Sequence, residues 1–219
     1  MSVSEINADI YSENYPSALD KLKKLPQFPQ IQAKIEQIGA EIEVIQNRKK
    51  ELYEKIRSGK TNITVLSSDL FFYKGILGYF DILLSKTLGQ DLIQKLLNCK
   101  QPIIIQQSNT CTYEVFLKPT LRHWVKLDLN MTWPRIQDGI ACHHRNIFCF
   151  IHELCHINNF ISGTWNFNKS IPDKKWGDKE EKDVCTGISY NHRGIALPYN
   201  IFNENNFRRL FQVPQRTRY

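Results

Sequence analysis

The chain has 219 residues, and its 42% hydrophobic and 23% charged content is typical of a globular domain. No apolar run approaches about 18 residues, and no basic segment followed by an apolar one opens the sequence. We therefore expect neither a membrane span nor a Sec-type signal peptide. The net charge of +7 attracts anions in general, but no nucleic-acid-binding motif accompanies it, so we expect no nucleic-acid partner.

Six cysteines are spread along the chain without a Cys-x-x-Cys pair or a regular spacing. Small secreted domains that depend on disulfides usually show such a framework in their sequence. Its absence here favours a reducing compartment. Cys149 and Cys155 fall within an apolar segment and are expected to be small buried hydrophobic residues.

Residues 1–20 are polar, rich in serine and asparagine, and only weakly periodic. They carry four carboxylates and no lysine or arginine (Glu5, Asp9, Glu13 and Asp20). Such a composition predicts a flexible leader, because little apolar surface is available for burial. Residues 21–219 are long enough for one folded domain, which we expect to be monomeric.

Two long helices are predicted in the first half of the chain. Between residues 31 and 56, isoleucines and a leucine recur at spacings of three and four, which predicts an amphipathic helix ended by Gly59. Its partner is expected to be another helix of the same chain. A second helix over residues 70–88, capped by Ser68 or Asp69 and stopped by Gly89, is apolar nearly all round and therefore central to the fold.

Short apolar segments predict strands at residues 62–66, 103–105, 113–117 and 124–129. The last three are separated by turn residues and are expected to form an antiparallel meander. Helices together with a small antiparallel sheet predict a single α+β domain. An open edge of that sheet could accept an extended peptide as an additional strand.

The segment with the most specific chemistry is His152-Glu153-Leu154-Cys155-His156. Positions i and i+4 share one face of a helix, so both imidazoles can bind the same metal ion. Glu153 then lies beside the open metal position, where a carboxylate can take a proton from water. The apolar residues around the segment predict a buried helix that runs to about Phe160 and ends at Ser162-Gly163-Thr164.

A third metal ligand is expected from the pair Glu180-Glu181, which lies 24 and 25 residues after His156 on a short predicted helix, 179–184. Only one of two adjacent carboxylates on a helix can face the ion. The other can orient a histidine or face solvent. A final helix is predicted from Glu204 to Phe211. The remaining histidines are expected to be structural or exposed (His123 and His192) or to lie in a loop before the metal helix (His143 and His144).

The order of these motifs over residues 150–219 resembles that of the NleD-type zinc metalloproteases, which bacteria inject into host cells through type III secretion. After His-Glu-x-x-His come Gly163-Thr164, Lys179-Glu180-Glu181, Glu204-Asn205-x-x-Arg208 and Pro214-x-Arg216-x-x-Tyr219. The order of His-Glu-x-x-His, Glu-Glu and Arg-x-x-Tyr is also similar to that of clostridial neurotoxin light chains. The resemblance implies a zincin-like domain built around an active-site helix.

The resemblance also implies a role for each matching residue. It implies Zn²⁺ bound by His152, His156 and Glu181, Glu153 as the general base, and Arg216 and Tyr219 as donors to the oxyanion. Residues 182–187 depart from the pattern of the family, so Glu180 stays an alternative to Glu181 as ligand.

A substrate class follows from the resemblance alone. NleD-type effectors cut stress-activated MAP kinases of the host at the Thr-x-Tyr motif of the activation loop, which suppresses inflammatory signalling. The resemblance thus implies secretion into the host cytoplasm, with residues 1–20 as the export signal, and a kinase partner. The alternative is a catalytically silent binding protein that contains a structural zinc site and sequesters a host protein. Such a site needs a fourth ligand, for which His143, His144 or Cys185 is available.

Overall fold

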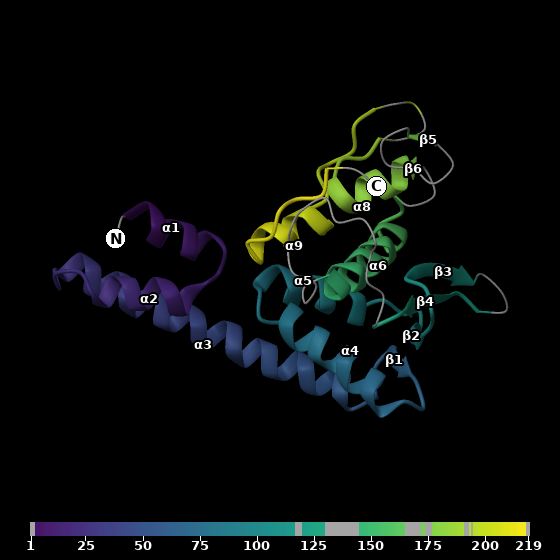
Figure 1. Ribbon diagram of the computed structural model, residues 1–219, viewed down its shortest axis with the longest axis horizontal. Helices are drawn as coiled ribbons and strands as arrows, with labels where there is room; N and C mark the ends of the chain where they lie inside the picture. The colour runs from purple at the N-terminus through teal and green to yellow at the C-terminus, as the bar shows by residue number, and fades with distance from the viewer. Residues whose placement is uncertain are drawn as a thin grey trace.

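The computed structural model combines helices with a small sheet that lies at one edge of the molecule (Figure 1). It describes residues 3–116, 120–129, 145–164, 172–173, 177–190, 193 and 195–217. The predicted α+β class is confirmed. The helices are α1 (Val3–Tyr11), α2 (Tyr15–Lys23), α3 (Pro29–Arg57), α4 (Leu70–Leu83), α5 (Thr87–Leu97), α6 (Arg145–Ile161), α8 (Lys179–Thr186) and α9 (Glu204–Leu210). The strands are β1 (Ile63–Leu66), β2 (Ile103–Gln107), β3 (Thr112–Phe116), β4 (Arg122–Leu127), β5 (Pro172–Asp173) and β6 (Gly177–Asp178).

The main sheet is mixed, with strand order β1-β2-β4-β3. β2 pairs in parallel with both β1 and β4, and only β3 and β4 are antiparallel. The predicted meander is therefore wrong beyond the β3–β4 pair. Alternation in the sequence reports which face of a strand is buried, but not the direction of its neighbour. Ile103, Ile105 and Val125 are fully buried, as the two inner strands require.

The main core lies between this sheet and helices α3 to α6. The predicted helix over residues 70–88 is divided in two: Asp69 caps α4 by accepting a hydrogen bond from Phe71 N, and α4 ends at Leu83. Gly89 does not stop a helix but lies inside α5, where a Cβ atom would collide with the backbone oxygen of Leu83. The glycine thus allows the start of α5 to pack directly against the end of α4.

A second, smaller core joins α1 and α2 to the first half of α3. Ile6, Ala18, Leu22 and Ile38 are its buried residues. Residues 3–20, predicted to be flexible, are therefore helical and packed in this structure. Helix α1 supplies two apolar side chains to this core and α2 supplies four, too few for a strong periodicity in the sequence (Ile6 and Ile10; Tyr15, Ala18, Leu19 and Leu22). Burial against α3 provides the stabilisation that the isolated segments lack.

The long helix α3 connects the two cores, as Figure 1 shows. Ile38 belongs to the small core, whereas Leu52 and Ile56 belong to the main one. The prediction that α3 pairs with other helices of the same chain is confirmed by its contacts with α2, α4 and α5. The described helices include none that is both long and apolar enough to cross a membrane.

Candidate metal centre

Helix α6 carries the His-Glu-x-x-His segment through the middle of the fold, between the sheet and helices α5, α8 and α9 (Figure 1). Phe150, Ile151 and Leu154 are fully buried in the main core. The polar side chains of the segment are buried too, with exposures of 5–7%. Because water does not reach these groups freely, their partners must come from other elements of the protein.

The two imidazoles face one another and the carboxylate of Glu181. The Nε2 atoms of His152 and His156 are 3.0 Å apart. Glu181 Oε2 lies 3.1 Å from His152 Nε2, and Glu181 Oε1 lies 3.3 Å from His156 Nε2. Two ring nitrogens from α6 and a carboxylate from α8 thus converge on one point, and these are groups that bind transition metals. We call His152, His156 and Glu181 the metal group.

The opposite nitrogen of each imidazole contacts a buried carboxylate. His156 Nδ1 is 2.6 Å from Glu180 Oε1, and His152 Nδ1 is 3.0 Å from Glu204 Oε2. When Nδ1–H donates to a carboxylate, the lone pair of Nε2 is directed to the other side of the ring, as in carboxylate–histidine–metal triads. The geometry therefore gives the adjacent glutamates different positions: Glu181 lies on the metal side and Glu180 behind His156.

The local structure of α8 determines how the two glutamates are presented. Asp178 caps the helix by accepting a hydrogen bond of 2.8 Å from the backbone N–H of Glu181. The helix ends at Gly187 in the left-handed conformation, with φ of 71°, where a Cβ atom would collide with the backbone oxygen of Asn200. A fixed start and a fixed end keep the first turn of α8 against α6.

A metal ion fits this donor set. Without a cation, two Nε2 lone pairs would face the Glu181 carboxylate in a buried site, and Glu181 Oε2 makes no hydrogen bond although His152 Nε2 is near. Two nitrogens on one tetrahedral ion, each at about 2.0–2.1 Å, lie about 3.3 Å apart. The observed 3.0 Å is close to this spacing. The buried histidines and carboxylates can therefore hold a metal.

The carboxylates and the histidines shift one another's pKa values. Burial lowers the pKa of His156, but the neighbouring Glu180 and Glu181 outweigh it and raise that pKa to about 9. Burial raises the pKa of Glu181, but the two histidines, at 3.1 and 3.3 Å, outweigh it and hold that pKa below its usual value. The site therefore favours positive charge beside Glu181.

Glu204 is the centre of a second set of contacts behind His152. Arg208 Nε lies 2.6 Å from Glu204 Oε1, and Arg216 Nη1 lies 3.1 Å from Glu204 Oε2. Burial raises the pKa of Glu204, but His152 and the arginines lower it below its ordinary value, so the carboxylate stays ionised. Its role was not predicted from the sequence, although the Glu-Arg spacing of four residues on α9 could have indicated an anchored carboxylate.

Arg216 lies on the Glu204 side of His152. Its Nη1 is 3.8 Å from Cys185 Sγ as well as close to Glu204. Asn205 holds its backbone in two hydrogen bonds, of 2.6 Å from Arg216 N and 2.9 Å to Arg216 O. The tail is therefore docked at this residue. Tyr219, the other residue predicted to stabilise an oxyanion, lies outside the described residues.

Cys185 belongs to the same side and forms a second candidate metal group with His152 Nδ1 and Glu204. Its Sγ is 3.5 Å from Glu204 Oε2 and 3.8 Å from His152 Nδ1. Burial and the charge of Glu204 raise the pKa of the thiol to about 11, so it is protonated at neutral pH. Because two arginines already balance Glu204, this group is satisfied without an ion. The other proposed fourth ligands, His143 and His144, lie outside the described residues.

Glu153 and His123 occupy different environments. Glu153 is buried beside the metal group, and burial raises the pKa of its carboxyl, which the two histidines partly oppose.

His123 is fully buried in β4 and pairs through Nδ1 with the Tyr113 hydroxyl at 2.8 Å. Tyr113 in turn stacks on His156 with ring centroids 5.7 Å apart. His123 therefore has the structural position expected of it, whereas His192 lies outside the described residues.

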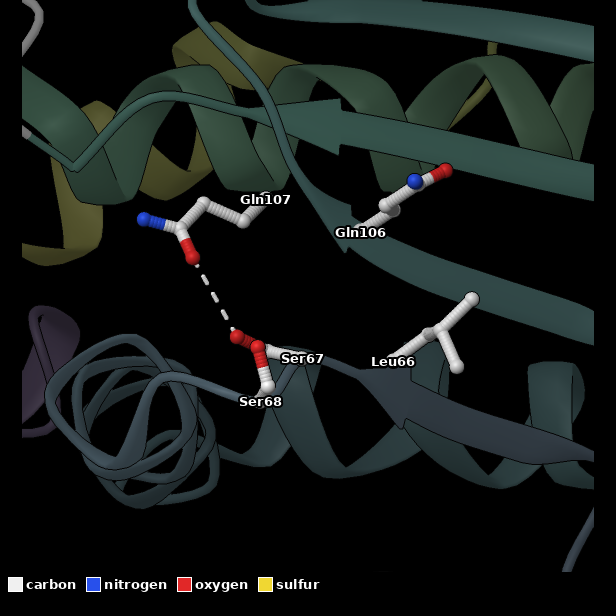
Figure 2. Close-up of a pocket in the computed structure, with 5 residues that line it drawn as sticks. All are labelled: Leu66, Ser67, Ser68, Gln106 and Gln107. Atoms are coloured by element: carbon white, nitrogen blue, oxygen red, sulfur yellow. Dashed lines mark hydrogen bonds between the residues drawn. The ribbon is translucent and has the colours of Figure 1, made fainter.

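A separate pocket lies where β1 and β2 end, as Figure 2 shows. It is lined by Leu66, Ser67, Ser68, Gln106 and Gln107. The Ser67 hydroxyl donates to Gln107 Oε1 at 3.2 Å. The pocket has no acid or base in its lining, so the metal group is the better candidate for a reactive site.

The sequence matches no family model, and no curated protein or solved structure is significantly similar to it. The resemblance to NleD-type proteases therefore rests on the motif residues of the sequence alone.

Proposed function

We propose that this protein is a zinc-dependent endopeptidase. The observation that carries the proposal is the convergence of His152 Nε2, His156 Nε2 and the Glu181 carboxylate at 3.0–3.3 Å from one another. Two imidazoles and one carboxylate are the protein ligands of many catalytic zinc sites, which keep a fourth position for water. Bound zinc would supply Lewis acidity toward the carbonyl and toward this water.

Glu153 is the residue we assign to proton transfer. It follows His152 directly on α6, and its raised pKa brings the carboxyl closer to neutral pH, where a general base is most effective. Glu153 would accept the proton of the attacking water and then deliver it to the amine that leaves.

Glu180 and Glu204 would hold the histidines in the tautomer that presents Nε2 to the ion. Arg216 supports this arrangement through Glu204. The proposed contribution of Arg216 and Tyr219 to the oxyanion stays a prediction from the resemblance, and it requires the guanidinium to act on the metal side of His152.

The proposed substrate is a host protein, and the resemblance suggests the activation loop of stress-activated MAP kinases. Delivery by type III secretion has the same support. An extended peptide could pair with the outer edge of β3, which is an edge strand of the main sheet and contacts α6. Residues 1–20 would have to unfold for export, because α1 and α2 are folded in this structure.

Metal analysis of the purified chain, together with a cleavage assay on purified MAP kinases, tests the proposal. We expect one equivalent of zinc and kinase fragments cut at the Thr-x-Tyr motif, with Glu153→Gln as the inactive control. Zinc binding without cleavage of any protein would support the alternative of a silent binding protein. That alternative has less support here, because Cys185 lies behind His152 and not on the side of Glu181.

A further inference from the structure

The last residue of α1 and the turn that follows it, residues 11–14, contact the segment that carries Glu204. We call these residues the elbow. The Tyr11 hydroxyl accepts a hydrogen bond of 2.9 Å from Arg209 Nη1, and the Ser12 hydroxyl accepts one of 2.9 Å from Gln212 Nε2. Figure 1 shows the turn beside α9. The elbow therefore binds the last turn of α9 and Gln212, which lies two residues after the helix ends.

The same elbow is anchored to α5. Glu13 Oε2 accepts a hydrogen bond of 2.6 Å from the backbone N–H of Thr87, and its other oxygen contacts the Thr87 hydroxyl. The α5 N-cap residue, Lys86, makes no capping bond of its own, so Glu13 supplies the missing acceptor. Lys86 Nζ also donates to the backbone oxygens of Ser12 and Glu13, at 2.7 and 3.2 Å.

Backbone conformation on both sides of this contact indicates that it is held firmly. Glu13 has φ of 53° and Gln212 has φ of 57°, which is the left-handed region that residues with a Cβ atom rarely occupy. Such conformations persist where surrounding contacts enforce them. Here the contacts are those between the elbow, α5 and the end of α9.

Helix α9 needs such support because it has only seven residues. At its first position it carries Glu204, which holds His152 Nδ1. After its last residue, Phe211 packs on Phe148 of α6 with ring centroids 6.1 Å apart, and Lys86 lies over the Phe211 ring at 5.7 Å. The elbow therefore acts on the opposite end of the helix that orients a metal-binding histidine.

We propose that Tyr11 and Ser12 are positioning residues for the metal site, acting through Arg209, Gln212 and α9 on Glu204. The inference rests on the proposed metal function only in its effect on zinc, because the local stability of α9 can be measured without metal. It assigns the N-terminal helices a role in the site itself.

The test compares two double variants with the same chemical change. Tyr11→Phe with Ser12→Ala removes the hydroxyls that bind Arg209 and Gln212. The control, Tyr15→Phe with Ser17→Ala, removes hydroxyls that bind Glu41 and Asp9 within the small core. Both are made in the full chain, and circular dichroism checks that both fold.

Two measurements are made on each variant. Hydrogen exchange of residues 204–211 in the metal-free protein reports how readily α9 opens locally, and competition with a chelator reports zinc affinity. We expect faster exchange in the elbow variant only, and zinc binding weakened about threefold to tenfold, below the range of about 10–100-fold for direct partners of a ligand.

The two measurements separate the possible failures. Unchanged exchange at residues 204–211 in the elbow variant overturns the inference, and so does an equal increase in both variants, which would indicate general destabilisation. A wild-type chain that binds no zinc refutes the proposed function, while the exchange data still decide the role of the elbow. A variant pair that fails to fold is replaced by Tyr11→Phe against Tyr15→Phe, judged by the same criteria.

Discussion

Each imidazole of the metal group lies between two carboxylates, and the atoms they contact determine their roles. His156 has Glu180 at Nδ1 and Glu181 at Nε2. Glu180 therefore orients the ring, whereas Glu181 faces the nitrogen that is available to a metal ion. The spacing of His152, Glu153 and His156 was sufficient to predict a metal site. It could not predict Glu204, because a partner 52 residues away in the sequence is recognised only after the chain has folded.

Replacement of the proposed general base should separate binding from catalysis. Glu153→Gln removes the proposed proton acceptor but none of the three proposed ligands, so zinc content should stay at the wild-type level. The rate of proteolysis should fall about 100-fold or more. Parallel metal analysis and cleavage assays measure both. A zinc-loaded variant with near-normal turnover would contradict the role of Glu153.

Substitution of each of the two adjacent glutamates should reduce the affinity for zinc by a different amount. Glu181→Gln replaces a proposed ligand and should abolish stoichiometric zinc binding. Glu180→Gln weakens only the hydrogen bond behind His156 and should reduce affinity by about 10–100-fold. Chelator competition on both variants measures which substitution weakens zinc binding more. A larger loss for Glu180→Gln would show that Glu180, and not Glu181, is the ligand.

His123 should make stability depend on pH in the acidic range. Burial lowers its pKa to about 4, whereas the unfolded chain binds this proton below about 6.5. Its contribution to stability is therefore complete above about 6.5 and is lost as the pH falls toward 4. Urea unfolding at several pH values should show a smaller acid loss for His123→Gln than for wild type. Parallel curves would show that His123 does not titrate as expected.

At the scale of elements, the helices were more predictable than the sheet. The bounds of α3, α6 and α9 agree closely with the sequence pattern, because apolar periodicity and the residues that start or stop a helix are local signals. The parallel pairing of β2 with β4 has no such signal, since it depends on contacts between distant residues. Gly89 predicts a helix end from the sequence, but a glycine in an apolar segment can equally allow close packing.

Two glycines offer a test of this packing. Gly89→Ala should destabilise the protein by about 1–3 kcal/mol, because the new Cβ would collide with the backbone oxygen of Leu83. Gly78→Ala on α4 is the matched control: nothing lies within 4 Å of its Cβ, so alanine should be neutral or stabilising by up to about 1 kcal/mol. Urea unfolding measures both, and equal effects would argue against the close approach of α4 and α5.

At the scale of the whole molecule, the protein has one large and one small core connected by α3. The metal group belongs to the large core, and its helices come from residues 145 to 210. The sequence was most informative over this part of the chain. It was least informative over residues 1–20, whose burial depends on the apolar face of α3 and not on their own composition.

Removal of residues 1–24 should expose the face of α3 that α1 and α2 cover. Ile38 is fully buried in the intact protein, and Ile31, Ile35 and Ile42 pack around it. We expect the truncated chain to bind the dye ANS and to self-associate on size-exclusion chromatography, because large exposed apolar patches promote association. ANS fluorescence and an elution volume equal to those of the intact chain would show that the small core is dispensable.

The contacts of the elbow also bear on the order of folding. Tyr11 and Arg209 are 198 residues apart in the sequence, and Ser12 and Gln212 are 200 apart. Contacts between residues so far apart in sequence close large loops, so we expect them to form after the local helices and hairpins. Glu204 would then reach its final position in the same step. The candidate metal site would accordingly be completed only after most of the surrounding core has formed.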